Sequence, residues 1–259
     1  MRNKKYILMA IFLLLITVIV FSSQGLWAAE KKVYINGVDP DYPPFTYMDE
    51  KGNPAGFDIE CLNWIADEMG FEVQHQPTAW DGIVASLLAK KIDMIYSGMS
   101  ITEERKEKID FTDVYWEVVS SVCVREDSDL NIITALSGEY RLGIQKGTSQ
   151  ARWIEENLVK PGILGGDKVK YYEGKAMAVK DLVNGRIDSF LDDENMLKNA
   201  IRLGQPIRIV GTIWEKTPDE YGVGIRKEDK ELKALLNEGI ARLKKSPKWD
   251  ELIAKYFSE

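Results

Sequence analysis

The chain has 259 residues and a formal charge of −7, with 41 Asp and Glu against 34 Lys and Arg. This length is enough for one or two domains with a core that needs no covalent staples. The acidic balance argues against nucleic-acid binding, which relies on basic surface. The single histidine, His75, argues against a zinc site or a histidine-based catalytic triad. His75 lies in the polar segment "QHQP", where we expect it to be solvated.

The amino-terminal segment has the order of a secretory signal. Residues 2–5 are basic, residues 6–21 are apolar without interruption, and a polar "SSQG" and a small "AA" follow. Sixteen apolar residues are short for a spanning helix, so the sequence favours a cleaved signal peptide at 1–29 over a retained anchor. Its removal would shift the formal charge from −7 to −10, and no cysteine near the junction supports lipid modification.

Strand-like and helix-like segments alternate after the predicted signal. Such alternation predicts sheets with parallel strands flanked by helices. The carboxyl-terminal segment predicts two helices broken near Ser246-Pro247. In the first half, the expected elements are a strand at 32–37, a helix at 57–70 that ends on Gly70, a strand at 71–77, a helix at 80–91 and a strand at 92–98.

Two cysteines remain in the predicted mature chain. Cys61 lies in a helical pattern and Cys123 in a strand pattern, and neither has a metal ligand at useful spacing. We therefore expect two buried free thiols rather than a disulfide, and no metal or cofactor.

One internal similarity indicates the architecture. The segments "IVASLLAKKIDMIYSG" (83–98) and "MAVKDLVNGRIDSFLDD" (177–193) each contain a helix, a turn with a cation, and then Ile-Asp opening a buried strand. The shared offsets predict two lobes of related structure. Because open α/β sheets place their sites at the carboxyl ends of the strands, Ser97-Gly98 and Asp192-Asp193 are expected to face each other across a cleft.

The groups near these strand ends carry opposite charges. Arg105 follows the first strand end by one turn, beside the amides of a helix that Ser100 or Thr102 can cap. A guanidinium fork with nearby amides is a good receptor for a carboxylate. Asp193 suits an ammonium group, and Asp192 can share that role, point to solvent or cap the next helix.

Aromatic and hydroxyl side chains complete the predicted cleft. Tyr42 and Trp80 can sandwich an aliphatic chain or hold a cation, or belong to ordinary packing. Asp39 adds a carboxylate at the same mouth, although Asp39-Pro40 also suits a turn. In the second half, Thr148 and Ser149 open a helix and offer amides to an anion. An anion receptor, a cation receptor and an aromatic clamp together suit a zwitterionic amino acid.

Several blocks resemble a known family, the amino-acid-binding proteins of ABC uptake systems. They are "YPPFTYMDEKGNPAGFDIECLNWIADEMG", "SGMSITEERKEKIDFTDVYW", "GIQKGTSQA", "RIDSFLDDENM" and "YGVGIRKEDKELKALLNEGI". The resemblance implies the type II periplasmic binding fold, in which two α/β lobes with mixed, mainly parallel sheets are joined by two hinge crossings. It places lobe 1 at 32–114 plus 222–259, the hinges at 115–119 and 217–221, and lobe 2 at 120–216. It also implies a monomer outside the cytoplasm that delivers its ligand to membrane permease subunits.

The resemblance also assigns roles to the cleft residues. Arg105 matches the arginine that grips the ligand α-carboxylate, assisted by the amides of Ser100 and Ser149. Asp193, the Gly98 carbonyl and the Ser100 hydroxyl match the α-ammonium receptor. The residues expected to bind ligand are Asp39, Tyr42, Trp80, Ser97, Gly98, Ser100, Arg105, Thr148, Ser149, Asp192 and Asp193.

Ligand preference is inferred from the acidic residues of the cleft. Asp39 and Asp192 favour a basic amino acid such as arginine, lysine or ornithine, with glutamine or another neutral polar amino acid as the alternative. An acidic ligand is disfavoured because no extra Lys or Arg is expected at the cleft apart from Lys146. Some relatives on this scaffold are cyclohexadienyl dehydratases, but Asp192 is the only surplus acid available as a general acid. The chain is therefore expected not to be an enzyme.

Overall fold

The structure is a computed structural model, and it describes residues 31–213 and 219–258. The predicted signal peptide at 1–29 lies outside the described residues. The residues from Val33 onward group into one compact unit. Within the described part, none of the helices has the length and apolar character that crossing a membrane requires.

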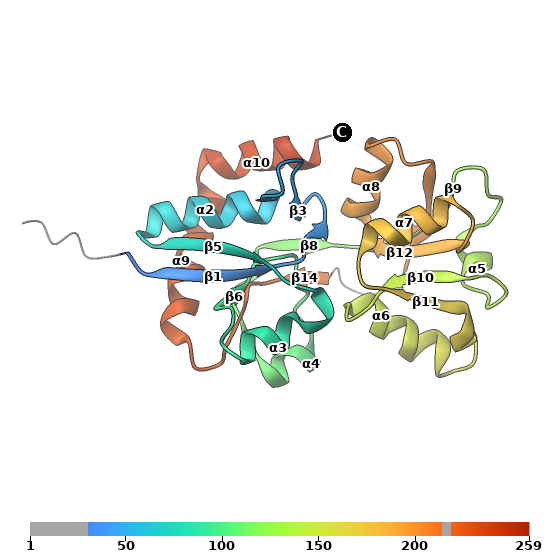
Figure 1. Ribbon diagram of the computed structural model, residues 1–259, viewed down its shortest axis with the longest axis horizontal. Coiled ribbons are helices and arrows are strands. Elements are labelled where there is room, and N and C mark those ends of the chain that lie inside the picture. The colour runs from blue at the N-terminus through green and yellow to red at the C-terminus, as the bar shows by residue number, and fades with distance from the viewer. Residues whose placement is uncertain (1–30, 214–218, 259) are drawn as a thin grey trace, which may run out of the picture. The chain divides into compact units, whose positions relative to one another are not determined.

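The first sheet has mixed strand directions and is covered on both faces by helices. β1 runs parallel to β5 and β6, whereas β15 runs antiparallel to β6 and β7. Figure 1 shows α2 and α10 on one side of these strands and α3 and α4 on the other. In sheet order the strands are β5 (Glu72–Pro77), β1 (Val33–Val38), β6 (Met94–Ile95), β15 (Gly224–Ile225) and β7 (Asp110–Phe111). The helices are α2 (Phe57–Met69), α3 (Ile83–Leu88), α4 (Glu103–Lys108), α9 (Lys230–Lys245) and α10 (Pro247–Phe257).

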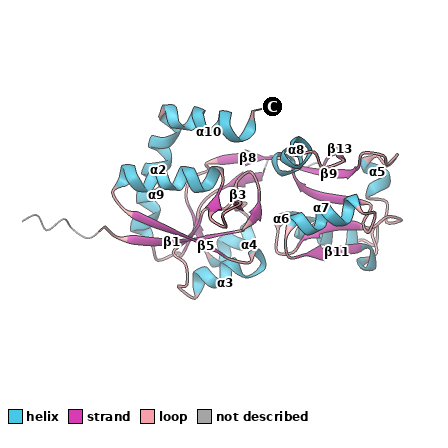
Figure 2. Cartoon of the chain, turned by 45° about the horizontal axis from the view of Figure 1, so that its top comes forward, coloured by secondary structure: helices cyan, strands magenta, loops and turns pink. Residues whose placement is uncertain are grey.

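The second sheet repeats this plan. β10 is parallel to β11 and β12, and β9 is antiparallel to β12 and β13. Figure 2 shows its helices grouped around the strands. The strand order is β11 (Val169–Tyr172), β10 (Leu142–Gln145), β12 (Ser189–Asp193), β9 (Ser120–Arg125) and β13 (Ile207–Thr212). The helices are α5 (Ile132–Ala135), α6 (Ser149–Ile154), α7 (Lys175–Val183) and α8 (Glu194–Arg202). The predicted two-lobed α/β fold with mixed sheets is confirmed.

Two small sheets complete the fold. β8 (Trp116–Val118) pairs antiparallel with β14 (Asp219–Tyr221), and a three-stranded sheet is formed by β2 (Asp41–Tyr42), β3 (Thr46–Met48) and β4 (Pro54–Ala55). β8 and β14 fall in the two segments predicted as hinges, although 217–218 lie outside the described residues. The lobe and hinge boundaries stay predictions.

The predicted internal similarity corresponds to a repeated helix-to-strand unit. α3 leads to β6 and α7 leads to β12. Asp93 accepts a hydrogen bond from the backbone N–H of Ile35 at 2.9 Å, and Asp188 accepts one from Arg141 at the same distance. Each Ile-Asp pair thus uses its carboxylate to fasten its strand to the neighbouring strand.

Helix ends follow the predicted signals. α2 ends at Gly70, which has a φ of 77°, a left-handed conformation that glycine adopts without strain. Thr102 caps α4 by accepting from the N–H of Arg105. Ser246-Pro247 separates α9 from α10, with proline at the first turn of the second helix. The expected helix at 80–91 is shorter, because Trp80–Gly82 form a 3₁₀ turn before α3.

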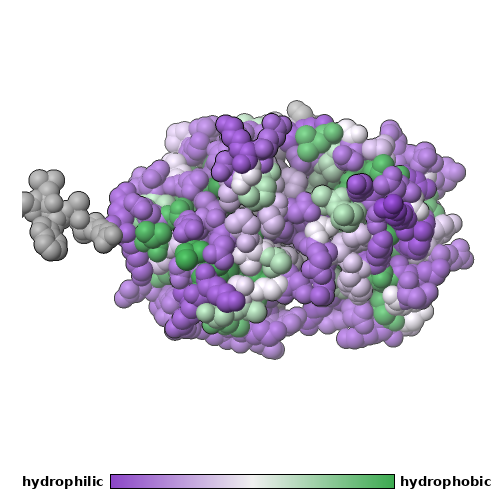
Figure 3. All heavy atoms as spheres, viewed as in Figure 1, coloured by the Kyte–Doolittle hydropathy of each residue, from purple (hydrophilic) through white to green (hydrophobic). Residues whose placement is uncertain are grey.

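The single histidine and the two cysteines are all at least partly buried. Cys61 and Cys123 are buried free thiols, as predicted. The expectation that His75 is solvated is wrong, because its ring is half-buried and hydrogen-bonded to Asn36 and Asn63. Burial lowers the pKa of His75 to about 4, so the ring is neutral at pH 7 and joins β5 to its neighbours. The face drawn in Figure 3 is mostly hydrophilic, with scattered apolar side chains.

Candidate functional site

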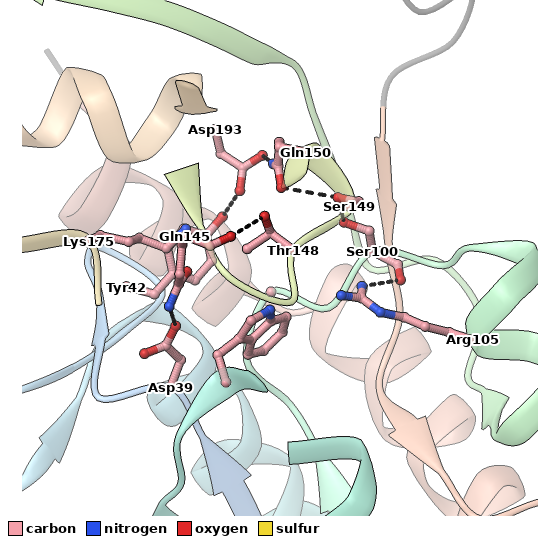
Figure 4. Close-up of a pocket in the computed structure, with 12 residues that line it drawn as sticks. Asp39, Tyr42, Ser100, Arg105, Gln145, Thr148, Ser149, Gln150, Lys175 and Asp193 are labelled. Atoms are coloured by element: carbon pink, nitrogen blue, oxygen red, sulfur yellow. Dashed lines mark hydrogen bonds between the residues drawn. The ribbon is translucent and has the colours of Figure 1, made fainter. Parts of the chain in front are cut away.

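A small pocket forms where the carboxyl ends of strands from both sheets meet. Nine of the predicted ligand-binding residues line it, and Ser97 and Asp192 do not. Three lining residues, Gln145, Gln150 and Lys175, were not predicted to bind ligand. Figure 4 shows side chains from both lobes pointing into this pocket. The lining residues are Asp39, Tyr42, Trp80, Gly98, Ser100, Arg105, Gln145, Thr148, Ser149, Gln150, Lys175 and Asp193.

Arg105 forms the positive end of the pocket. Its guanidinium donates to the backbone carbonyls of Ser100 at 2.8 Å and Gly147 at 3.2 Å, and it lies 5.5 Å from the ring centroid of Trp80. Burial lowers the pKa of Arg105 to about 10, so it is still a cation at neutral pH. The bonds to carbonyls fix the orientation of the fork without neutralising it, which suits a ligand carboxylate.

Ser100 and Ser149 stand beside this cation. Their hydroxyl oxygens are 3.1 Å apart, and both hydroxyls donate to a carboxylate oxygen of Asp219. Thr148 caps α6 by accepting from the N–H of Ala151, and this bond places Ser149 at the first position of that helix. The two hydroxyls therefore lie side by side, and Ser100 also contacts Arg105 through its carbonyl. Assistance from the amides of Ser100 and Ser149 in holding a carboxylate stays a prediction.

Asp193 forms the negative end. One carboxylate oxygen accepts from the hydroxyls of Tyr42 and Tyr221, each at 2.6 Å, and the other accepts from Gln150 at 2.7 Å. Burial is the larger cause and the charge of Asp193 the second, and together they raise the pKa of Tyr42 and of Tyr221 well above the ordinary value of a tyrosine. Both hydroxyls therefore stay protonated and hold the carboxylate in place. A ligand ammonium is the complementary partner.

Asp39 and Gln145 meet at a second acidic point. The Gln145 amide nitrogen donates to Asp39 at 2.9 Å and to the carbonyl of Glu173 at 3.2 Å. Two acceptors beside the nitrogen fix the orientation of the carboxamide. The Gln145 Oε1 is buried and has no hydrogen-bond partner among the described residues. An unsatisfied buried acceptor is costly, so this oxygen suits a donor from a ligand.

Ser97 supports Asp39 from behind. The Ser97 hydroxyl accepts from the Asp39 N–H at 2.9 Å and lies 2.8 Å from the hydroxyl of Thr46. It is fully buried and outside the pocket lining. The structure therefore gives Ser97 a positioning role, and a direct ligand contact stays a prediction.

Lys175 is the main difference from the predicted site. Its Nζ donates to both carboxylate oxygens of Asp192 at 2.8 Å and lies 4.2 Å from the ring centroid of Tyr42. Burial alone would lower the pKa of Lys175, but Asp192, Asp193 and Asp39 raise it further than burial lowers it. The expectation of no extra cation apart from Lys146 is wrong, because Lys175, the first residue of α7, lines the pocket. Lys146 itself pairs with Asp81 and is outside the lining.

The pocket walls touch one another across the two lobes. Tyr42 reaches Asp193, Asp39 reaches Gln145, and Arg105 reaches the Gly147 carbonyl. The cavity between them has a volume of about 10 Å³, close to the space that one water molecule needs. An amino acid therefore fits only if the walls separate and these contacts are exchanged for contacts with the ligand.

Asp58 lies directly behind the pocket. Its carboxylate accepts from the Gly98 N–H at 2.7 Å and from the Tyr115 hydroxyl at 2.8 Å, and its other oxygen has no partner among the described residues. Burial raises the pKa of Asp58 to about 7, and the two hydrogen bonds only partly oppose this shift. The folded protein therefore retains a proton on Asp58 that the unfolded chain releases near its ordinary pKa.

This shift predicts a pH dependence of stability. Because the carboxyl pKa is raised in the folded state, the contribution of Asp58 to the free energy of unfolding falls as pH rises from about 4 to about 7 and stays constant above that. For Asp58 the loss between pH 5 and pH 8 should be about 2–3 kcal/mol in the free energy of unfolding. Asp58→Asn should remove this part of the decline, as measured by urea unfolding at both pH values. An unchanged decline in the variant would contradict the assignment.

Comparisons with known proteins agree on one family. The model of the bacterial extracellular solute-binding proteins, family 3, matches residues 34–259. A histidine-binding periplasmic protein of Salmonella typhimurium is 32% identical and covers 93% of this chain and 94% of its own. An L-cystine-binding protein of Escherichia coli is 29% identical over 92% of this chain and 88% of its own. A solved ancestral arginine-binding protein bound to glutamine has a TM-score of 0.79 at 30% identity and covers 88% of this chain and 99% of its own.

Proposed function

Because this chain belongs to the bacterial extracellular solute-binding proteins, family 3, we propose that it captures one polar L-amino acid outside the cytoplasm. Arg105 receives the α-carboxylate and Asp193 the α-ammonium. The observation that supports this most directly is the placement of these two charges, buried or partly buried, in one pocket lined from both lobes. The names of the relatives described above state that they bind amino acids, and this supports the same class of ligand here.

Capture couples binding to lobe closure. Arg105 belongs to the segment proposed as lobe 1, and Asp193 to lobe 2, so a bound zwitterion contacts both lobes only when they are shut. A ligand that makes these contacts only in the shut form stabilises that form by the difference. We place the hinges at 115–119 and 217–221, where β8 and β14 pair. The shut monomer then delivers its ligand to the permease subunits of an ABC importer.

Two ligand classes suit the pocket. Asp39 lines it and supports the basic class, namely arginine, lysine and ornithine. Gln145, whose carboxamide lies against Asp39, supports glutamine or another neutral polar amino acid. The dehydratase alternative is weaker, because Asp192, its general acid, is bonded to Lys175 and lies outside the lining. We therefore propose binding without catalysis.

Calorimetric titration of the purified protein tests this function. The ligands are the twenty common amino acids with ornithine, citrulline and cystine added, and prephenate and arogenate are assayed for turnover. We expect one group of polar amino acids to bind with a dissociation constant near micromolar, about −8 kcal/mol. Absence of binding by every amino acid would contradict the proposal, and turnover of either cyclohexadienyl acid would favour the enzyme.

A further inference from the structure

Lys175 gives the far end of the pocket a positive charge of its own. We propose that this built-in cation makes the pocket select amino acids whose side chain ends in both a hydrogen-bond donor and an acceptor, such as an amide, a ureido group or a second zwitterionic head. Side chains that end only in a cation are selected against. The inference rests on the proposed function and concerns which ligands that function admits.

The first step is that Lys175 is held in place. Its side chain is 5% exposed and that of its partner Asp192 is 3% exposed, and both donor–acceptor distances are 2.8 Å. The face of Tyr42 covers the ammonium at 4.2 Å from the ring centroid, a distance at which a cation and an aromatic ring attract each other. A buried, paired and covered ammonium does not move aside easily, because it would leave Asp192 unpaired.

The second step is the charge that remains for a ligand side chain. A bound amino acid uses Arg105 and Asp193 for its backbone groups, which leaves Asp39 and Lys175 among the charged lining residues to face the side chain, with Asp192 outside the lining and paired with Lys175. Lys175 already neutralises Asp192, and its charge also acts on Asp39 and Asp193. A purely cationic tail would compete with this ammonium for the same carboxylates and be repelled by it. Asp39 and Asp192 were the two acidic residues that favoured a basic ligand, and of these only Asp39 remains for the ligand side chain.

The third step is the set of hydrogen-bonding groups that a tail would meet. Asp39 and the unpartnered Gln145 Oε1 accept hydrogen bonds. Lys175 donates, and both of its hydrogen bonds to described residues go to Asp192, while an ammonium carries three protons. A tail with N–H groups and an oxygen can satisfy all three side chains, whereas an ammonium or guanidinium has no acceptor for Lys175. Figure 4 shows Gln145, Tyr42 and Lys175 together at the side of the pocket away from Arg105.

Isothermal titration of the wild type and of Lys175→Met tests this inference. Glutamine, citrulline and cystine are compared with arginine, lysine and ornithine. In the wild type we expect at least one ligand of the first group to bind at least about tenfold more tightly than any of the second. The ratio to follow is the affinity for the tightest ligand of the first group divided by the affinity for the tightest ligand of the second. In Lys175→Met this ratio should fall by at least about tenfold, because Asp192 becomes available to a cationic tail.

The controls separate the possible failures. Lys180→Met removes an exposed cation from the same helix and should leave the ratio unchanged. If Lys175→Met does not fold, Lys175→Gln keeps a donor for Asp192 without the charge and should shift the ratio in the same direction. Tighter binding of a basic ligand by the wild type, or a ratio that neither variant changes, overturns the inference but leaves the proposed function standing. No binding of any amino acid by the wild type overturns the proposed function itself.

Discussion

Arg105→Ala is expected to weaken the binding of every amino acid ligand by at least about 100-fold. Removing one partner of a buried, hydrogen-bonded charge pair costs about 2–5 kcal/mol, and each 1.4 kcal/mol is a factor of about ten. The loss should be similar for all ligands, because Arg105 is assigned to the α-carboxylate that they share. Titration of the variant with the tightest wild-type ligands measures it. Affinity retained within tenfold would show that the carboxylate binds elsewhere.

Two further variants serve as comparisons. One tests the planar geometry of the guanidinium against charge alone, and the other tests whether a change in α4 affects folding. Arg105→Lys keeps a cation but loses the planar pair of donors, so its affinity should lie between those of the wild type and Arg105→Ala. Lys106→Ala changes the next residue of α4, an exposed lysine paired with Glu103. It should bind like the wild type. If Lys106→Ala loses affinity to the same degree, damage to α4 rather than a lost ligand contact would explain both results.

The fold was largely predictable from the sequence, because its signals are local. A helix followed by a turn and Ile-Asp occurs twice, and both aspartates accept from a backbone N–H, of Ile35 within β1 and of Arg141 just before β10. Gly70 and Ser246-Pro247 marked helix ends for similarly local reasons. Strand lengths were less predictable, since β6 is only Met94–Ile95 within the expected strand at 92–98. Strand ends depend on which neighbour is available for pairing, and this is set by the tertiary fold.

The pocket lining was predictable where a charged residue ends a strand, as Asp193 ends β12. Lys175 was missed because a lysine at the start of a helix is typically solvated, and the sequence carries no sign of its burial. Only the packing of α7 against Tyr42 and Asp192 turns it inward. Asp192 was interpreted as available to a ligand for the same reason. Asp192 was easy to find in the sequence, but its pairing with the buried Lys175, which is distant in sequence, changes the role that it can have.

Asp193→Asn is the second variant with a large expected effect. The carboxylate is buried and accepts from Tyr42 and Tyr221 on one oxygen and from Gln150 on the other. An asparagine can keep the tyrosine bonds through its carbonyl, but its amide group would face the Gln150 amide, and the charge is lost. We therefore expect folding to persist and the affinity for an α-ammonium to drop by at least about 100-fold.

The comparison that decides this assignment uses ligands with a modified amino group. Against wild type, Asp193→Asn should lose most of the discrimination between an amino acid and its N-acetyl derivative, because the receptor for the ammonium has become neutral. Glu194→Gln, at the adjacent residue, removes a carboxylate that pairs with Lys198 outside the pocket and should change neither quantity. If Asp193→Asn binds the amino acid within tenfold of wild type, the ammonium is held by another group, and Asp39 is then the acid to replace next. That result would also reverse the orientation of the ligand, because Asp39 lies beside Gln145 and Lys175, where the side chain of the ligand is placed.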